Sequence, residues 1–259
     1  MTARDALGAA LDALTAAGCE TPRLDAELLI ADALGVSRAD LAMDPALPVS
    51  GRAARLIGER VRRRVAREPV AYILGVKGFR RLMLRVDGRV LIPRPETELL
   101  VEVALELPAG ARVHDVGTGS GAVALALIDE RPDLVVSASD ASSSAVEVAR
   151  ANGLDAVVHR GLPAGEYDMV VANLPYVRED EWEGLAPEIR LWEPREALVG
   201  GVDGLDAIRS LIAQTPVGVQ LALEHAPAQT EAIKELLRSP RVLSDLAGLP
   251  RVTVGEPRV

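Results

Sequence analysis

Residues 113–121 read Val-His-Asp-Val-Gly-Thr-Gly-Ser-Gly, and they are the most informative part of the chain about its architecture. Its apolar beginning, Val113 to Val116, predicts a short buried strand. The glycines that follow predict a tight turn into a helix over Ala122–Asp129, because glycine adopts positive φ at little cost. Glycine also lets a ligand approach main-chain amides that a Cβ would block. The stretch therefore predicts a strand-loop-helix unit with a nucleotide cradle.

The alternation of strand and helix continues toward the C-terminus. Strands are expected at 135–139, 169–172 and 217–224, and helices at 142–151, 204–214 and 228–237. Two short β runs, Val242–Leu246 and Arg251–Val254, follow in the tail. Strands that alternate with helices favour parallel pairing, with helices on both faces of the sheet. We therefore expect an α/β fold with a doubly wound, mostly parallel sheet.

The chain before the glycine loop has a different pattern. Helical spacing of apolar residues predicts three helices before Gly75: one through Leu14, one from Pro22 to Gly35 and one from Ser50 through Arg67. Residues 80–92 instead alternate apolar and polar side chains around Asp87-Gly88, which predicts a β-hairpin. A further helix is expected from Pro93 through Leu107.

These patterns predict three parts of the chain. A helical domain covers residues 1–75, a β-hairpin linker covers 76–93, and the α/β domain covers 94–259. We interpret the helical domain as the part that recognises the substrate.

Composition bounds the class of protein. Hydrophobic residues make up 49% and charged residues 26% of the 259 residues, which is typical of a soluble globular chain. One cysteine, Cys19, excludes an internal disulfide framework, and no apolar run approaches the length of a membrane span. The first residues do not read as a secretory signal, so we expect a cytoplasmic protein.

Charge is unevenly distributed along the chain. The net charge of −9 argues against general nucleic-acid binding, yet residues 51–95 hold 13 Lys and Arg against three acids. This basic stretch could face an acidic partner or RNA, or it could be a solvated helix face whose arginine stems cover apolar surface.

The acidic residue after the next predicted strand indicates the kind of ligand. Asp140 lies 19 residues beyond Gly121, where its carboxylate can accept both hydroxyls of a ribose. Gly117, Gly119 and Ala122 also match the dinucleotide pattern, whereas three alternate glycines after Asp115 suit S-adenosylmethionine. Either reading implies an adenosine-containing cofactor. The candidate cofactor-binding residues are Asp115, Gly117, Thr118, Gly119, Ser120, Gly121, Asp140 and Asn173.

A polar tetrapeptide, Asn173-Leu174-Pro175-Tyr176, follows the apolar strand at 169–172. The Asn173 carboxamide oxygen and the Leu174 carbonyl could accept both hydrogens of an NH₂ group, and the Tyr176 ring could pack on a flat substrate group. Two such acceptors would align a conjugated nitrogen lone pair with a methyl donor and stabilise the developing positive charge. The candidate catalytic residues are Asn173, Leu174, Pro175 and Tyr176.

Other titratable residues give weaker signals. His114, His159 and His225 are scattered without metal-ligand spacing, so no metal is expected. Glu224 ends a predicted strand, and we expect a carboxylate satisfied by its neighbours.

Several segments together resemble the release-factor glutamine N5-methyltransferases, the PrmC/HemK family. They are Glu68–Gly75, Val90–Glu98, Asp115–Gly121, Asn173–Tyr176, Glu193–Leu198 and Gly200–Asp206. The Pro-Arg-Pro-Glu-Thr-Glu segment is specific to this family among methyltransferases, whereas the Asn-x-Pro-Tyr box is shared with DNA adenine methyltransferases. Leu174 stands where the family has a proline and still offers a main-chain carbonyl.

The resemblance implies a Rossmann-like methyltransferase fold and S-adenosylmethionine as methyl donor. It implies that the substrate is the glutamine of the Gly-Gly-Gln loop of peptide chain release factors. Gly117–Gly121 and Asp140 would hold the cofactor, Asn173, the Leu174 carbonyl and Tyr176 would hold the glutamine amide, and the Arg94 region would lie near the cofactor entrance. We expect a monomer that contacts neither membrane nor nucleic acid.

Three alternatives stay open at this point. The chain could methylate another amine, such as a nucleobase or a small metabolite. It could be a non-catalytic module that kept the cofactor-binding fold. A nicotinamide enzyme is a third alternative, although no hydride-transfer residues are visible.

Overall fold

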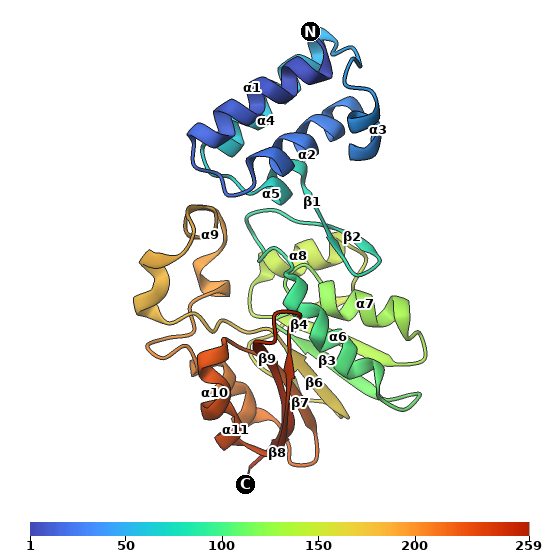
Figure 1. Ribbon diagram of the computed structural model, residues 1–259. Helices are drawn as coiled ribbons and strands as arrows, with labels where there is room; N and C mark the ends of the chain where they lie inside the picture. Colours follow the sequence, from blue (N-terminus) through green and yellow to red (C-terminus); the bar gives the residue numbers. More distant parts are fainter. Residues whose placement is uncertain (259) are drawn as a thin grey trace. The chain divides into compact units, whose positions relative to one another are not determined.

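The computed structural model describes residues 1–258, which form two compact units (Figure 1). The first unit contains Met1–Gly75 and a later segment, Ala186–Trp192. The second contains Val76–Leu185 and the chain from Glu193 onward. The two units are described separately below.

The first unit is helical. Its helices are α1 (Ala3–Ala16), α2 (Pro22–Leu34), α3 (Arg38–Met43), α4 (Gly51–Val65), α5 (Val70–Leu74) and, from the later segment, α9 (Pro187–Trp192). The three helices predicted from periodicity are confirmed as α1, α2 and α4. Pro22 begins α2, and Gly35 ends it in the left-handed conformation, as predicted.

Arginines of the basic stretch at the end of α4 and just after it form ion pairs within this helical unit. Arg64 of α4 is buried, and its Nε donates to Asp25 Oδ2 at 2.7 Å. Glu188 of α9 forms ion pairs with both Arg64 and Arg67, with N–O distances of 2.8 and 2.7 Å. Arg63 binds Glu68 at 2.6 Å. Arg64 thus connects α4 to Asp25 of α2 and Glu188 of α9, and removing one of these partners would leave a buried charge.

The second unit is built on β-strands and the helices that cover them. Its strands are β1 (Val76–Phe79), β2 (Leu82–Arg85), β3 (Arg112–Val116), β4 (Val135–Asp140), β5 (Ala156–Val158), β6 (Met169–Ala172), β7 (Gln220–Glu224), β8 (Leu237–Ser244) and β9 (Pro250–Pro257). Its helices are α6 (Glu98–Leu105), α7 (Ala122–Glu130), α8 (Ser143–Ala151), α10 (Asp206–Gln214) and α11 (Thr230–Leu236). Short 3₁₀ helices are η1 (Pro95–Thr97), η2 (Glu179–Gly184), η3 (Arg195–Ala197) and η4 (Pro227–Gln229).

Within residues 1–258, seven strands form one sheet in the order β5-β4-β3-β6-β7-β9-β8. Strands β5, β4, β3, β6 and β7 run parallel, and β9 pairs antiparallel with β7 and β8. The predicted doubly wound, mostly parallel sheet is confirmed. The strand order reverses between β3 and β6, and ligands bind at such a reversal in this architecture.

Helices cover both faces of the sheet (Figure 1). On one face α6 and α7 pack with Met169 and Val171 of β6, and on the other α10 and α11 pack with Val170 and Ala172. Because each face is buried, β6 is apolar along its whole length, as expected of a central parallel strand.

The predicted turn at Asp87-Gly88 is wrong. The hairpin pairs β1 with β2 and turns at Arg80-Arg81, where Arg80 has a φ of 51°. Arg80 reaches Glu130 of α7 at 2.6 Å and also binds Glu102 of α6, so long-range ion pairs hold this turn. Asp87 instead accepts a local hydrogen bond from the Arg89 amide at 3.1 Å.

No helix among residues 1–258 has both the length and the apolar character that crossing a membrane requires.

Candidate active site

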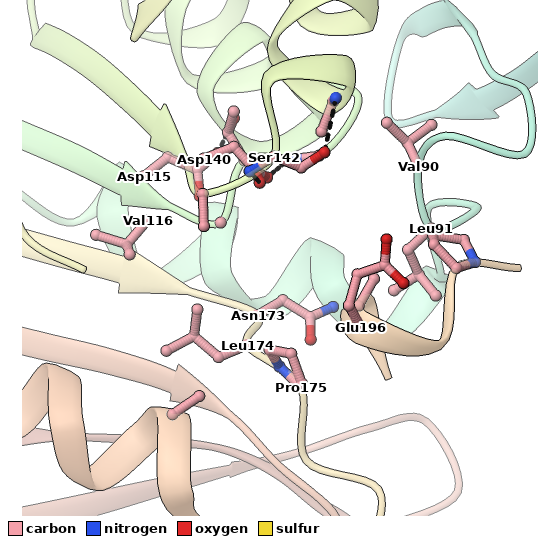
Figure 2. Close-up of a pocket in the computed structure, with 18 of the residues that line it drawn as sticks. Val90, Leu91, Asp115, Val116, Asp140, Ser142, Asn173, Leu174, Pro175 and Glu196 are labelled. Atoms are coloured by element: carbon pink, nitrogen blue, oxygen red, sulfur yellow. Dashed lines mark hydrogen bonds between the residues drawn. The ribbon is translucent and has the colours of Figure 1, made fainter. Parts of the chain in front are cut away.

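A cavity of about 820 Å³ opens at the carboxyl ends of β3, β4 and β6, where the strand order reverses (Figure 2). Segments at the ends of these three strands, within 115–123, 140–145 and 173–175, form one part of its lining, and segments within 89–97, 159–161 and 194–211 complete it. This volume lies within the usual range for small-molecule and cofactor sites.

The glycine loop forms one wall of the cavity. Gly117, Gly119 and Gly121 all have positive φ, at 75°, 55° and 86°. A Cβ on Gly119 would meet nothing within 4 Å, so this part of the main chain borders open space. A Cβ on Gly121 would lie 3.0 Å from Leu154 Cδ2, which places Gly121 against the packed interior. Of the predicted loop residues, the cavity lining includes Asp115, Gly117, Thr118, Gly119 and Ser120, but not Gly121.

Asp140 links the two loops on this side of the cavity. Its Oδ2 accepts the Gly119 amide at 2.9 Å, and its Oδ1 accepts the Ser142 amide at 2.8 Å. These bonds fix the carboxylate at the end of β4, where the ribose-binding prediction placed it.

Asp115 is buried at the base of the loop. Its Oδ2 accepts the Thr118 hydroxyl at 2.6 Å and the Ala124 amide at 3.3 Å. Burial raises the pKa of Asp115 to about 6, and these two hydrogen bonds oppose that rise. The Asp115 carboxylate would stabilise a cationic ligand in the cavity, and such a ligand would lower the pKa of Asp115.

Asn173 follows β6 and extends along the cavity wall toward the side that holds Leu91 and Glu196 (Figure 2). Its Nδ2 donates to the Thr97 hydroxyl at 3.0 Å. This bond directs the NH₂ end of the carboxamide to Thr97, so the carboxamide oxygen remains available as an acceptor for a ligand.

The rest of the tetrapeptide is tightly packed. Leu174 Cδ2 lies only 3.0 Å from the position that a Cβ on Gly117 would take. A Cβ on Gly200 would be 2.2 Å from the Pro175 carbonyl oxygen, and one on Gly204 would be 2.1 Å from the Tyr176 carbonyl oxygen. The glycines at 200 and 204 therefore allow one loop to lie directly on the main chain of the tetrapeptide.

Tyr176 does not line the cavity, unlike the three residues before it. Its hydroxyl donates to Glu224 Oε1 at 3.3 Å, and its ring packs against the buried cluster beneath α10 and α11. Burial and the neighbouring Glu224 carboxyl raise the pKa of Tyr176. Stacking of this ring on a substrate therefore stays a prediction.

Several cavity residues were not assigned from the sequence. Thr97, Val90, Leu91 and Glu196 line it, and none of them was predicted to have a role. They lie in the segments at 90–98 and 193–198 that carry the family resemblance, and this position could have indicated that they line the site.

A buried glutamate joins those two segments. Glu193 Oε2 accepts the Ile92 amide at 3.1 Å, and Oε1 binds the Arg94 guanidinium. Arg94 itself is not part of the cavity lining, whereas its neighbour Pro93 is. The contacts of Glu193 therefore fix the segment at 92–94 that leads into η1, which carries Thr97.

The doubly wound sheet, the glycine loop, the strand-end aspartate and the Asn-x-Pro-Tyr box define an S-adenosylmethionine-dependent methyltransferase. Two family models match the chain, the PrmC N-terminal domain over residues 5–75 and the methyltransferase small domain over residues 95–189. Among solved structures, the hMettl16 catalytic domain in complex with a MAT2A 3′UTR hairpin has a TM-score of 0.51 at 12% identity, covering 81% of this chain and 83% of that one. This likeness shows the fold alone.

Curated relatives match nearly the whole chain. The release factor glutamine methyltransferase of Caulobacter vibrioides is 37% identical over 95% of this chain and 93% of that protein. The protein of the same name from Coxiella burnetii is 40% identical over 91% of this chain and 92% of that protein. The chain belongs to the release factor glutamine methyltransferase family, and the resemblance noted from its motifs is confirmed.

Proposed function

We propose that this protein transfers a methyl group from S-adenosylmethionine to the side-chain amide nitrogen of the glutamine in the Gly-Gly-Gln loop of a peptide chain release factor. The family relationship supports this substrate. The observation that carries the chemistry is the hydrogen bond from Asn173 Nδ2 to Thr97, because it leaves the carboxamide oxygen to accept from a substrate NH₂ group.

The cofactor residues that we propose are those of the glycine loop together with Asp140. The open space beside Gly119 admits a ligand against the main chain, and Asp140 is already fixed by two amides. Asp115 supplies negative charge for the methionine ammonium group. Gly121 contributes to the shape of the loop, because its packing against Leu154 leaves no room for a side chain.

The acceptor residues act on a nitrogen that is a poor nucleophile. The bound cofactor supplies an electrophilic methyl group. Asn173 Oδ1 and the Leu174 carbonyl accept the two amide hydrogens, which turns the lone pair toward that methyl group and stabilises the positive charge that develops. Pro175 and Tyr176 fix the main chain that carries these acceptors, with Gly200 and Gly204 packed on it.

The division of labour along the chain is also part of the proposal. Residues 1–75 recognise the protein substrate, and residues 94–259 perform the methyl transfer. Residues 76–93 link these two domains. Separate family models for residues 5–75 and 95–189 support this division. We place the reaction in the cytoplasm, in a monomer that does not contact nucleic acid directly, and the net charge of −9 favours that last point.

The test uses the purified protein, full-length release factor and isotope-labelled S-adenosylmethionine. We expect label in one peptide, the one that contains Gly-Gly-Gln, and mass spectrometry should place a single methyl group on the glutamine. A release factor with that glutamine replaced is the control. An adenine-containing oligonucleotide and small amines are assayed in parallel, and methylation of one of these instead of the release factor would contradict the proposal.

A further inference from the structure

A half-satisfied carboxyl group lies at the end of β7, beside the strand that leads to Asn173. Glu224 is the last residue of β7 and is only 1% exposed. Its Oε1 accepts from the Tyr176 hydroxyl at 3.3 Å, but its Oε2 has no hydrogen-bond partner among the described residues. The expectation of a fully satisfied carboxylate is therefore wrong. Burying an unpaired carboxyl oxygen costs free energy, which a hydroxyl donated from a neighbouring side chain would offset.

Thr97 connects this carboxyl group to Asn173. Thr97 is 5% exposed, and its oxygen accepts the Asn173 Nδ2 hydrogen at 3.0 Å. Its own hydroxyl hydrogen is then free to donate, and Glu224 is near enough for the Thr97 hydroxyl to lower the pKa of its carboxyl. A hydroxyl that donates to a carboxylate can only accept from the amide on its other side. The direction of the Thr97 hydroxyl thus decides which end of the Asn173 carboxamide points away from it.

We propose that Glu224 is a positioning residue for methyl transfer: its carboxylate orients the Thr97 hydroxyl, which in turn makes Asn173 present its oxygen to the substrate nitrogen. The catalytic consequence rests on the proposed function, whereas the orientation of the carboxamide is a property of the free protein. The same carboxylate accepts from Tyr176, so both polar ends of the Asn-x-Pro-Tyr box are tied to one group.

The charge of Glu224 decides the direction of this relay. Burial raises the pKa of Glu224 to about 7, with Glu96 adding to the rise and Thr97, Tyr176 and Arg251 opposing it. The adjacent His225 bonds Thr253 at 2.7 Å, and burial lowers the pKa of His225. The Arg94 and Arg251 charges also act on Tyr176.

Protonation of Glu224 would reverse the relay. A carboxylic acid carries a hydrogen of its own, and in the proposed relay it donates this hydrogen to the Thr97 oxygen. Thr97 would then donate to Asn173, and the carboxamide would turn its NH₂ group toward the substrate. Two NH₂ groups facing each other cannot form a hydrogen bond. The rate of methyl transfer should therefore rise with pH through about 7.

The first experiment observes the carboxamide directly and needs no substrate. In ¹⁵N-labelled protein, the side-chain NH₂ signals of Asn173 are assigned by their loss in Asn173→Asp. We expect these signals to shift between pH 5.5 and 8.5 with a midpoint near 7, and to stop titrating in Glu224→Gln. Signals that do not titrate, or that titrate unchanged in Glu224→Gln, would overturn the inference.

The second experiment measures kinetics on the release factor. Removing the relay hydroxyl with Thr97→Val should lower kcat about tenfold, the effect expected of one misdirected hydrogen bond, while KM and the cofactor Kd change less than about twofold. Thr97→Ser keeps the hydroxyl and should restore most of kcat. Thr215→Val is the matched control, because Thr215 is about as buried as Thr97, is not part of the cavity lining, and donates its hydroxyl to the main-chain Leu211 O at 2.8 Å.

The outcomes separate the inference from the proposed function. A purely structural role of Thr97 or Glu224 would lower the melting temperature and cofactor affinity together and would leave the pH dependence of kcat in place. Equal kcat for Thr97→Val and Thr97→Ser in an active enzyme would overturn the inference. A wild-type protein whose Asn173 signals titrate but which leaves the release factor unmethylated would refute the proposed function and support the relay.

Discussion

The two sides of the cavity are built in different ways. On the side of β3 and β4, the site is shaped mainly by the main chain. The amides of Gly119 and Ser142 donate to Asp140, and the glycines leave space for a ligand. On the side of β6 and β7, the site is shaped by hydrogen bonds between side chains. Thr97 and Asn173, which bond each other there, lie 76 positions apart in the chain. A main-chain site is encoded in one short motif, whereas a side-chain relay exists only once the fold has formed.

The largest effect should come from breaking the β6 side. Asn173→Ala removes an acceptor that acts on the developing charge, so kcat should fall about 100-fold or more, with the cofactor Kd nearly unchanged. Steady-state kinetics and calorimetry measure the two quantities.

The matched variant is Asn152→Ala, whose amide donates to the Ser120 carbonyl at 2.9 Å on the other side of the cavity. It should change the cofactor Kd more than kcat. If Asn173→Ala and Asn152→Ala changed the cofactor Kd equally, the two sides of the cavity would not differ in their role in cofactor binding.

The second prediction concerns the pH dependence of folding. His114 of β3 is buried with its ring nitrogens 2.8 and 2.9 Å from Ser137 and Ser139, and burial lowers its pKa to about 4. The unfolded chain binds this proton near pH 6.5, so stability falls as pH falls from 6.5 toward 4. Between pH 7 and 4.5 wild type should lose about 2 kcal/mol more than His114→Gln, as measured by urea unfolding. Equal losses in both proteins would show that His114 does not titrate in this way.

A smaller effect is expected at the cofactor carboxylate. Asp140→Asn keeps one acceptor oxygen but loses the charge, so S-adenosylmethionine should bind about tenfold more weakly. At saturating cofactor kcat should stay within about twofold, because the acceptor side is unaltered. A large loss of kcat at saturation would mean that Asp140 also serves the transfer step.

The smallest effect should appear where the two sides touch. Gly117→Ala places a methyl group 3.0 Å from Leu174 Cδ2 and strains a residue with a φ of 75°. Leu174→Ala relieves the contact but not the strain, so the double variant should be about 0.5–1 kcal/mol more stable than the sum of the single effects. Chemical unfolding of all four proteins gives this coupling, and strict additivity would show that the contact carries no strain.

The parts predicted from the sequence are those that depend on local signals. The strand-loop-helix unit at 113–130, the strand-end Asp140 and the helices bounded by proline or glycine were predicted in place. Short elements such as α3 and β5 were missed, since a few residues give too little periodicity.

What the sequence could not give depends on contacts between distant segments. The hairpin turn was misplaced because acids on α6 and α7 hold Arg80. Thr97 was not assigned because its partner Asn173 lies 76 positions away, and the burial of Glu224 Oε2 without a partner exists only in the folded chain. The candidate site was thus predicted on its main-chain side and only in part on its side-chain side.

The salt bridges of Glu188 bear on how this protein can be recombined with its relatives. The chain enters the helical unit a second time, and Glu188 pairs there with Arg64 and Arg67. A chimaera that exchanges residues 1–75 alone would separate the buried Arg64 guanidinium from Glu188, and would leave it unpaired wherever the other parent lacks an acid at that position. Functional hybrids should therefore require the segments at 1–75 and 186–192 to be inherited from the same parent.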